Sequence, residues 1–198
     1  MSESLPEGGI IRKMWSVEAS RYREHLLRLD AVSRRNRFGG DVSDEFLAEY
    51  AALATSMDTV IHGFFVNGTM RGAAELRPIG APITREAEAA FSIEEPWQSH
   101  GVGSALLARM LLAARNRGIT FLHMAYLADN ERMRQLASKF DAELRFDFGS
   151  VVGELAAPHP TPISVAREIV ADSHGLATAS AQRADAAAEL SLSHAASG

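Results

Sequence analysis

The sequence contains no cysteine. Disulfide bonds, cysteine-ligated metals and a cysteine nucleophile are therefore excluded, and the composition suits a reducing compartment. Basic residues are also in deficit, because 20 Lys and Arg stand against 25 Asp and Glu, which gives a formal net charge of −5. Nucleic-acid binding normally requires a clustered excess of positive charge, so we expect no nucleic-acid partner.

Long hydrophobic runs and a leader are missing as well. No stretch approaches the roughly 18 apolar residues of a membrane span, and the N-terminus has no basic segment followed by an apolar one. We therefore expect a cytoplasmic protein without a membrane partner. The histidines have no metal-ligand spacing, so we also expect no metal.

What is present fits a globular protein with 46% hydrophobic and 23% charged residues. A length of 198 residues allows one catalytic domain with a tail. We place the domain at residues 1–158. Residues 159–198 turn to Ala, Ser, His and Thr, which predicts a low-complexity, mostly flexible tail with a docked segment at 163–170.

Apolar periodicity, capping residues and turn residues predict the elements of the domain. Strands are expected at 10–17, 59–66, 70–77, 86–93, 121–127 and 143–155, and helices at 18–35, 43–53, 103–117 and 130–140. This β-α-α-β-β-β-α-β-α-β order predicts an α/β fold with a mixed sheet covered by helices on both faces. The dense basic run Arg34, Arg35 and Arg37 is interpreted as a solvated turn between two helices, the alternative being a phosphate or partner site.

The segment Gln98-Ser99-His100-Gly101-Val102-Gly103 joins a predicted strand to a predicted helix. Backbone N–H groups at such a junction converge on an anion, and glycine lets a ligand approach the main chain. A dinucleotide fingerprint would need Gly or Ala where the chain has Leu106, and a Walker loop would need Lys after Gly103. Neither fits, and a different phosphate cradle remains.

The remaining pattern, Q/R-x-x-G-x-G/A between strand and helix, resembles the acetyl-CoA signature of the GNAT superfamily. The similarity extends over AEAAFSIEEPWQSHGVGSALLARMLLAARNRGITFLHMAYLADNERMRQLASKF, from Ala87 to Phe140. Within the superfamily, the Trp-Gln pair, the Leu-Ala-Asp-Asn segment, the Met three positions after that Asn and SRRNRF at 33–38 resemble Pat-type protein lysine acetyltransferases.

The resemblance implies acetyl-CoA as cosubstrate and gives roles to particular residues. The main chain of Ile93, Glu94 and Glu95 would pair with the pantetheine arm. The pyrophosphate would be held by the turn that begins at Gln98, through amides of Ser99, His100, Gly101, Val102, Gly103 and Ser104. Asn130 would lie near the cofactor, and it is also an excellent helix N-cap.

Transfer to an amine requires a base, because a lysine with a pKa of about 10.4 is protonated at neutral pH. Glu88 is the first candidate, since it resembles the catalytic glutamate of many family members and lies within an apolar stretch that favours proton uptake. The alternative for Glu88 is the exposed start of a strand. Glu94 and Glu95 are the other candidates, with Glu94 preferred, because they would lie nearer the thioester if the strand splays there.

The sequence departs from the family pattern at Ala137, where many members have a tyrosine that protonates the leaving thiolate. Tyr126 is the fallback, with packing in its strand as the alternative. The favoured function is acetyl transfer by direct attack of a primary amine, a protein lysine being preferred to a small molecule. The alternatives are an acyl-CoA-binding sensor that has lost turnover and a structural partner module that uses the tail.

Overall fold

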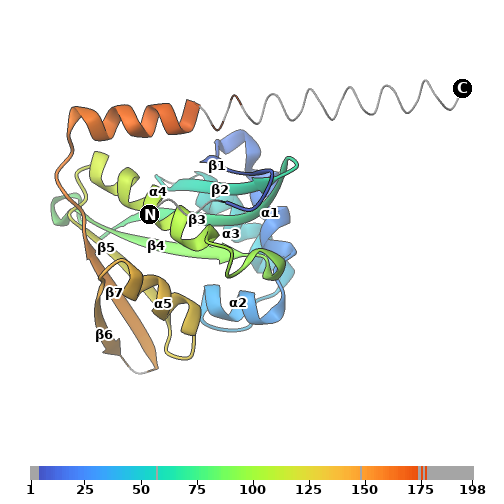
Figure 1. Ribbon diagram of the computed structural model, residues 1–198. Helices are drawn as coiled ribbons and strands as arrows, with labels where there is room; N and C mark the ends of the chain where they lie inside the picture. Colours follow the sequence, from blue (N-terminus) through green and yellow to red (C-terminus); the bar gives the residue numbers. More distant parts are fainter. Residues whose placement is uncertain (1–4, 57, 148, 174, 176, 178–198) are drawn as a thin grey trace, which may run out of the picture.

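The computed structural model describes residues 5–56, 58–147, 149–173, 175 and 177. In this part of the chain, seven strands form one sheet in the order β1-β2-β3-β4-β5-β7-β6, with helices on both faces (Figure 1). The strands are β1 (Gly9–Lys13), β2 (Val60–Val66), β3 (Thr69–Ile79), β4 (Glu86–Ile93), β5 (Phe121–Leu127), β6 (Glu143–Asp147) and β7 (Ser150–Ala156). The helices are α1 (Ala19–Leu27), α2 (Ala31–Phe38), α3 (Asp44–Ser56), α4 (Val102–Asn116) and α5 (Glu131–Lys139), with short 3₁₀ turns η1 (Ser16–Glu18), η2 (Pro82–Thr84) and η3 (Glu95–Trp97). The expected mixed sheet between helices is confirmed.

The expected helix at 18–35 is wrong in one respect, because it is broken before α2. Asp30 has extended backbone and accepts a hydrogen bond from the Ser33 N–H at 2.9 Å, which is a typical N-cap. The basic run therefore lies inside α2 and not in a turn. Its arginines form ion pairs with Asp44, Asp129 and Glu75.

The single strand expected at 143–155 is also wrong. The chain reverses near Gly149, whose φ of +90° lies in the left-handed region that glycine tolerates. The result is an antiparallel hairpin of β6 and β7. Strand β7 then inserts beside β5, so that β6 forms the edge of the sheet (Figure 1).

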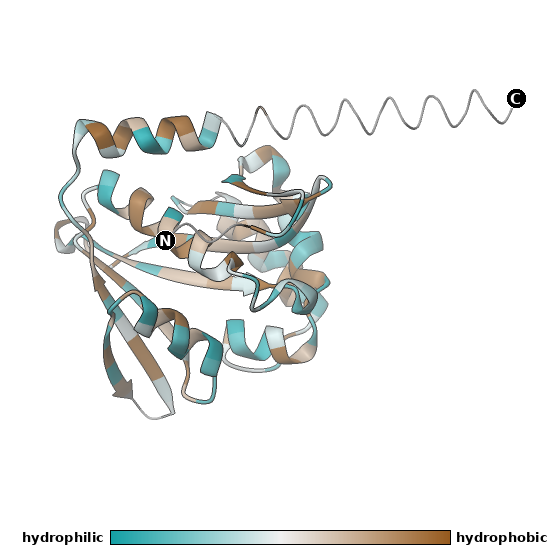
Figure 2. Ribbon diagram, viewed as in Figure 1, coloured by the Kyte–Doolittle hydropathy of each residue, from teal (hydrophilic) through white to brown (hydrophobic). Residues whose placement is uncertain are grey.

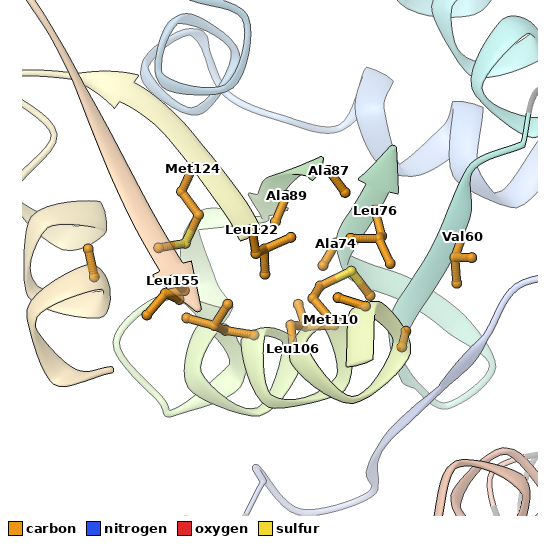
Figure 3. Packing of buried hydrophobic residues seen from close by; sticks show 14 of the residues in the cluster. Val60, Ala74, Leu76, Ala87, Ala89, Leu106, Met110, Leu122, Met124 and Leu155 are labelled. Atoms are coloured by element: carbon orange, nitrogen blue, oxygen red, sulfur yellow. The ribbon is translucent and has the colours of Figure 1, made fainter. Parts of the chain in front are cut away.

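The core lies on both faces of the sheet. On one face, Ala74, Leu76, Ala87, Ala89 and Leu122 point from the strands towards Leu106 and Met110 of α4 (Figure 3). A second cluster fills the space between the other face and helices α1 and α3. Burying each large apolar side chain stabilises the fold by about 1.5–3 kcal/mol. These two clusters hold β3 and β4 rigidly between layers.

Strands β4 and β5 pair in parallel only as far as Glu88 and His123. Beyond that register both strands continue, β4 to Ile93 and β5 to Leu127, without pairing to each other. The two strands therefore separate towards their C-terminal ends. A separated parallel pair leaves main-chain N–H and C=O groups that need other partners.

Residues 162–173 form a further helix that lies alongside α4 (Figure 1). It contacts α4 with polar side chains: Ser164 and Glu168 both bond to Asn116. Ile163, Ile169 and Val170 are exposed. Hydrophobic and hydrophilic residues, brown and teal in Figure 2, alternate along this helix. No helix within the described ranges has the length and apolar character needed to cross a bilayer.

Candidate functional site

The N-terminus of α4 is the first part of the site. Gly101 precedes the helix with φ +78° and without any side-chain cap, and Ser99 has φ +62°. The N–H groups of a first helical turn have no acceptor within the helix, and the helix dipole places partial positive charge there. A left-handed serine is uncommon and suggests a functional constraint. This end of α4 therefore fits an anionic group.

A groove of about 310 Å³ opens in front of this helix end. Six of the residues expected to bind the cofactor line it: Ile93, Gln98, Ser99, Gly101, Gly103 and Ser104. The side chains of His100 and Val102 lie elsewhere. His100 is exposed and bonds through Nδ1 to the Gln98 carbonyl at 2.6 Å, whereas Val102 is buried in the core.

The opposite wall of the groove comes from α5, which sequence reasoning did not include beyond Asn130. Arg132, Met133, Gln135, Leu136 and Lys139 line it. Lys139 reaches across to Ser104, with 3.1 Å between Nζ and Oγ. The spacing of these residues matches one face of a helix, which is the sequence signal that could have identified them. They add positive charge where an anion would lie.

Gln98 connects the groove to α2. Its Nε2 donates to the carbonyl of Ile93 at 2.8 Å and to Ser33 Oγ at 3.0 Å. The side chain therefore fixes the last residue of β4, whose carbonyl points into the gap between β4 and β5. The glutamine that begins the Q/R-x-x-G-x-G/A pattern therefore has a structural reason, because its side chain positions the main chain at the end of β4.

A second cavity, of about 110 Å³, occupies the gap between the separated strands β4 and β5. Glu88, Ser92, Tyr126 and Asn130 are among its lining residues. The two cavities adjoin, because Phe91, Ile93, Gln98, Arg132 and Met133 line both. An extended ligand with an anionic middle could therefore run from α4 into the gap.

Glu88 lies at the wall of the second cavity with 28% of its side chain exposed. Arg77 of the neighbouring strand donates to Glu88 Oε2 at 2.7 Å. This bond also raises the pKa of Arg77, so the arginine stays charged. Within the described residues, no hydrogen bond involves Glu88 Oε1. The carboxylate is held in place with one oxygen available to a ligand.

Glu94 has very different surroundings. Its carboxylate accepts hydrogen bonds from Arg28 and Arg71, each at 2.9 Å, and lies 3.2 Å from His25 Nδ1. Burial raises the pKa of Glu94, but the bonds from His25, Arg71 and Arg28 outweigh burial and leave the pKa below its ordinary value. A lowered pKa makes this carboxylate a weak base. Glu95 lies in η3 and does not line either cavity.

Asn130 caps α5 and lines the second cavity. Its side-chain oxygen accepts from the Met133 N–H at 3.2 Å, and the residue is 8% exposed. The N-cap interpretation is therefore confirmed, and its place at the cavity wall remains compatible with a cofactor contact. Ala137, about two turns along the same helix, is buried against Gly153. It offers no proton.

Tyr126 of β5 lines the same cavity and is 4% exposed. Its hydroxyl has no hydrogen-bond partner among the described residues. Burial raises the pKa of Tyr126, so the phenol remains protonated at neutral pH. An unpartnered buried hydroxyl is costly, and a site with a bound ligand is one explanation.

A buried network joins the helical layer to the sheet behind this cavity. Glu75 of β3 bonds to Tyr22, to Tyr50 Oη at 2.8 Å and to Arg37 NH2 at 2.5 Å. Burial raises the pKa of Tyr50 to about 12. Arg37 also lines the second cavity, so the network fixes one of its walls.

Comparison with known proteins gives a consistent result. The sequence profile described as "Acetyltransferase (GNAT) family" matches residues 23–141. The acetyltransferase Pat of Mycolicibacterium smegmatis is 28% identical over 85 residues, which cover 42% of this chain and 26% of that protein. The chain therefore matches about a quarter of the length of this curated relative.

Solved structures share the fold. The GNAT domain of S. lividans PAT has a TM-score of 0.64 at 24% identity, covering 74% of this chain and 89% of that one. The PaiA N-acetyltransferase of Thermoplasma acidophilum, in complex with coenzyme A, has a TM-score of 0.57 at 17% identity, covering 75% and 98%.

Proposed function

Because the chain belongs to the acetyltransferase (GNAT) family, we propose that it transfers the acetyl group of acetyl-CoA to a primary amine by direct attack. The observation that carries the proposal is that two cavities adjoin along the end of β4. One begins at an uncapped helix N-terminus that fits pyrophosphate, and the other ends beside a positioned carboxylate.

In this proposal, backbone amides of Ser99 to Ser104 and the ammonium group of Lys139 bind the phosphates. The pantetheine arm follows the end of β4, where Gln98 holds the Ile93 carbonyl. The thioester then lies in the gap between β4 and β5. The N–H of Glu94 donates to the Arg71 carbonyl at 2.9 Å and is therefore not available to the oxyanion. The main-chain N–H of Ile93 stabilises the oxyanion instead.

Glu88 takes the proton from the attacking amine, directly or through water. Arg77 orients the carboxylate through Oε2, and Oε1 faces the acceptor. The leaving thiolate has an intrinsic pKa near 8.5 and needs little assistance. The buried Tyr126 hydroxyl, which lines the same cavity, supplies a hydrogen bond to the departing sulfur.

For the acceptor we favour a protein lysine. The similarity to a protein named Pat supports this choice. Carboxylates of Glu86, Glu88 and Glu154 lie near His123 on the face of the sheet opposite α4, which supports a cationic acceptor. A small cationic amine would be the alternative outcome of an acceptor screen with labelled acetyl-CoA.

Two matched variants test the base. Glu88→Gln keeps size and hydrogen-bonding capacity but removes the basic oxygen. Acetyl-CoA affinity should hold, turnover should fall about 10²–10⁴-fold, and the remaining rate should rise with pH as the amine deprotonates unaided. Rates measured from pH 6 to 10 at saturating acetyl-CoA give this comparison.

Glu94→Gln is the matched variant, because it removes a carboxylate that is already occupied by three cationic or ring partners. It should lower stability while keeping the turnover and the pH profile of the parent, without the large loss of rate and the rise with pH expected for Glu88→Gln. If Glu94→Gln shows the loss of turnover and Glu88→Gln does not, Glu94 is the base. Acetyl-CoA binding without thiol release across a broad amine panel would favour a sensor over an enzyme.

A further inference from the structure

His25 makes a contact that the proposed reaction does not use. This residue of α1 is completely buried against the end of β4. Its Nε2 lies 2.9 Å from Ser92 Oγ, and its Nδ1 lies 3.2 Å from Glu94 Oε1. Ser92 and Glu94 are two positions apart on extended chain, so both side chains point to the helical layer that contains His25. The Ser92 hydroxyl, the His25 imidazole and the Glu94 carboxylate thus form a hydrogen-bonded triad.

The position of each proton in this triad follows from the neighbouring groups. Glu94 has a lowered pKa and is ionised, so its oxygens can only accept hydrogen bonds. His25 Nδ1 must therefore carry the proton that is donated to Glu94. Burial lowers the pKa of His25, which keeps the ring neutral and leaves Nε2 without a proton. Ser92 Oγ–H consequently donates to Nε2, which is the arrangement that activates a serine.

The Glu94 carboxylate of the triad is held in place by two arginines. Arg28 bonds to Glu94 through Nε and to the Met70 carbonyl through NH2 at 2.6 Å, and Arg71 holds the second carboxylate oxygen. Such support orients the imidazole in a single tautomer. The serine at the other end lines the cavity in the gap between β4 and β5, next to Ile93.

We propose that Ser92, His25 and Glu94 form a second nucleophilic centre, which accepts the acetyl group of acetyl-CoA when no amine is bound and then releases it to water. The inference rests on the proposed function, because it requires the thioester to lie in this cavity. The resulting activity is slow hydrolysis of short acyl-CoA thioesters through an acyl-serine.

The chemistry balances without another reagent than water. Ser92 Oγ attacks the thioester carbonyl, and its proton passes to His25 Nε2. The C–S bond breaks, and the thiolate takes that proton and leaves as CoA. A water molecule then attacks the serine ester with His25 as base, which gives acetate and restores the serine hydroxyl.

The experiment incubates the full chain with acetyl-CoA and no amine. Thiol release measures hydrolysis, and acid quenching during the first turnover followed by intact mass and peptide mapping detects the ester. We expect one acetyl group on Ser92 that hydroxylamine removes. Ser92→Ala and His25→Gln should each reduce thiol release about 10²–10⁴-fold.

Two further variants separate chemistry from folding. Ser92→Cys keeps a nucleophile and should trap the acetyl group as a thioester at the same position, even if His25→Gln fails to fold. Ser138→Ala removes an exposed hydroxyl on α5 and should leave thiol release and the acetylated site unchanged.

The outcomes distinguish the two proposals. If acetyl-CoA binds and acetyl reaches an amine, but Ser92 is never acetylated and Ser92→Ala hydrolyses acetyl-CoA as fast as the parent, the serine centre is overturned alone. If acetyl-CoA does not bind to the folded chain in calorimetry, the proposed function and the serine centre both fall.

Discussion

At the scale of single residues, identical groups acquire different chemistry from their surroundings. Glu88 lies near the start of β4, and Glu94 lies just after its end. Glu88 has one arginine partner and borders a cavity, whereas Glu94 is 6% exposed and is held by His25, Arg28 and Arg71. The first can exchange a proton with a ligand, and the second can only orient its partners.

Tyr126 allows stability and activity to be separated in one substitution. Tyr126→Phe removes a buried hydroxyl that lacks a partner among the described residues, so stability should hold or increase by about 1 kcal/mol. Turnover should fall about tenfold, less than the usual worth of a proton donor, because a thiolate leaves readily. Urea titration and steady-state rates measure the two effects. An unchanged rate would show that the hydroxyl does not serve the leaving group.

Gly103 tests the cradle at the start of α4. A Cβ there would meet Ile93 and Leu136 at 3.6 and 3.7 Å, which is ordinary contact, so the fold accepts a larger residue. Gly103→Val would place its methyl groups in the groove and should weaken CoA binding about tenfold or more, by at least 1.4 kcal/mol. Calorimetric titration measures it. Gly40→Val, at a glycine with open space around it, is the control, and equal affinities would refute the cradle.

The sequence predicts contacts that are local and misses those that are not. The anion-binding turn was predicted because Gly101, Gly103 and their neighbours are adjacent in the chain. The contact of His25 with Glu94 spans 69 residues, and that of Lys139 with Ser104 spans 35. Nothing in the spacing of single residues reports such pairs, because tertiary packing of α1 and α5 creates them.

At the scale of elements, the helix at 162–173 packs through its polar side. Ser164 is 2% exposed, donates from Oγ to Asn116 at 2.5 Å and accepts from the Thr161 N–H at 2.9 Å. Ile163 next to it is 68% exposed. An apolar pattern alone would therefore orient this helix the wrong way round.

A pair of neighbouring substitutions measures this docking. Ser164→Ala should lower the free energy of unfolding by about 1–3 kcal/mol, because it removes the buried Ser164 hydroxyl and leaves the half-buried Asn116 oxygen without its donor. Ile163→Ala should change it by about 0.5 kcal/mol or less, as expected for an exposed site. Urea midpoints decide between them. A larger effect at Ile163 would mean that the apolar face is the docked one.

Element boundaries were predictable where capping and turn residues mark them. Gly118 has positive φ just beyond α4, and Asn67 and Gly68 form the turn between β2 and β3. The break at Asp30 and the reversal at Gly149 were missed, because apolar spacing continues across both. Capping by Asp30 and strand pairing of β7 with β5 decided the outcome there.

At the scale of the whole molecule, the separation of β4 and β5 divides the sheet. The strands β1 to β4 lie between α4 and the α1–α3 layer, while β5 and β7 pack against α5 as well as α4. A ligand in the gap would contact both parts, since residues from β4, β5 and α5 line the same cavity. Acetyl-CoA would then replace the missing strand pairing.

Binding of this kind makes a quantitative prediction about stability. A ligand that binds only the folded chain should stabilise it by about 2.7 kcal/mol at a concentration of 100 times its Kd. Urea titration with and without CoA measures the shift. Hydrogen exchange should locate the added protection in residues 90–104 and 125–139, which border the cavities, and leave α3 unchanged. Protection confined to the start of α4 would mean that CoA binds by its phosphates alone. In that case the gap between β4 and β5 would not hold the thioester, and the assignments of Glu88 and Tyr126 would lose their basis.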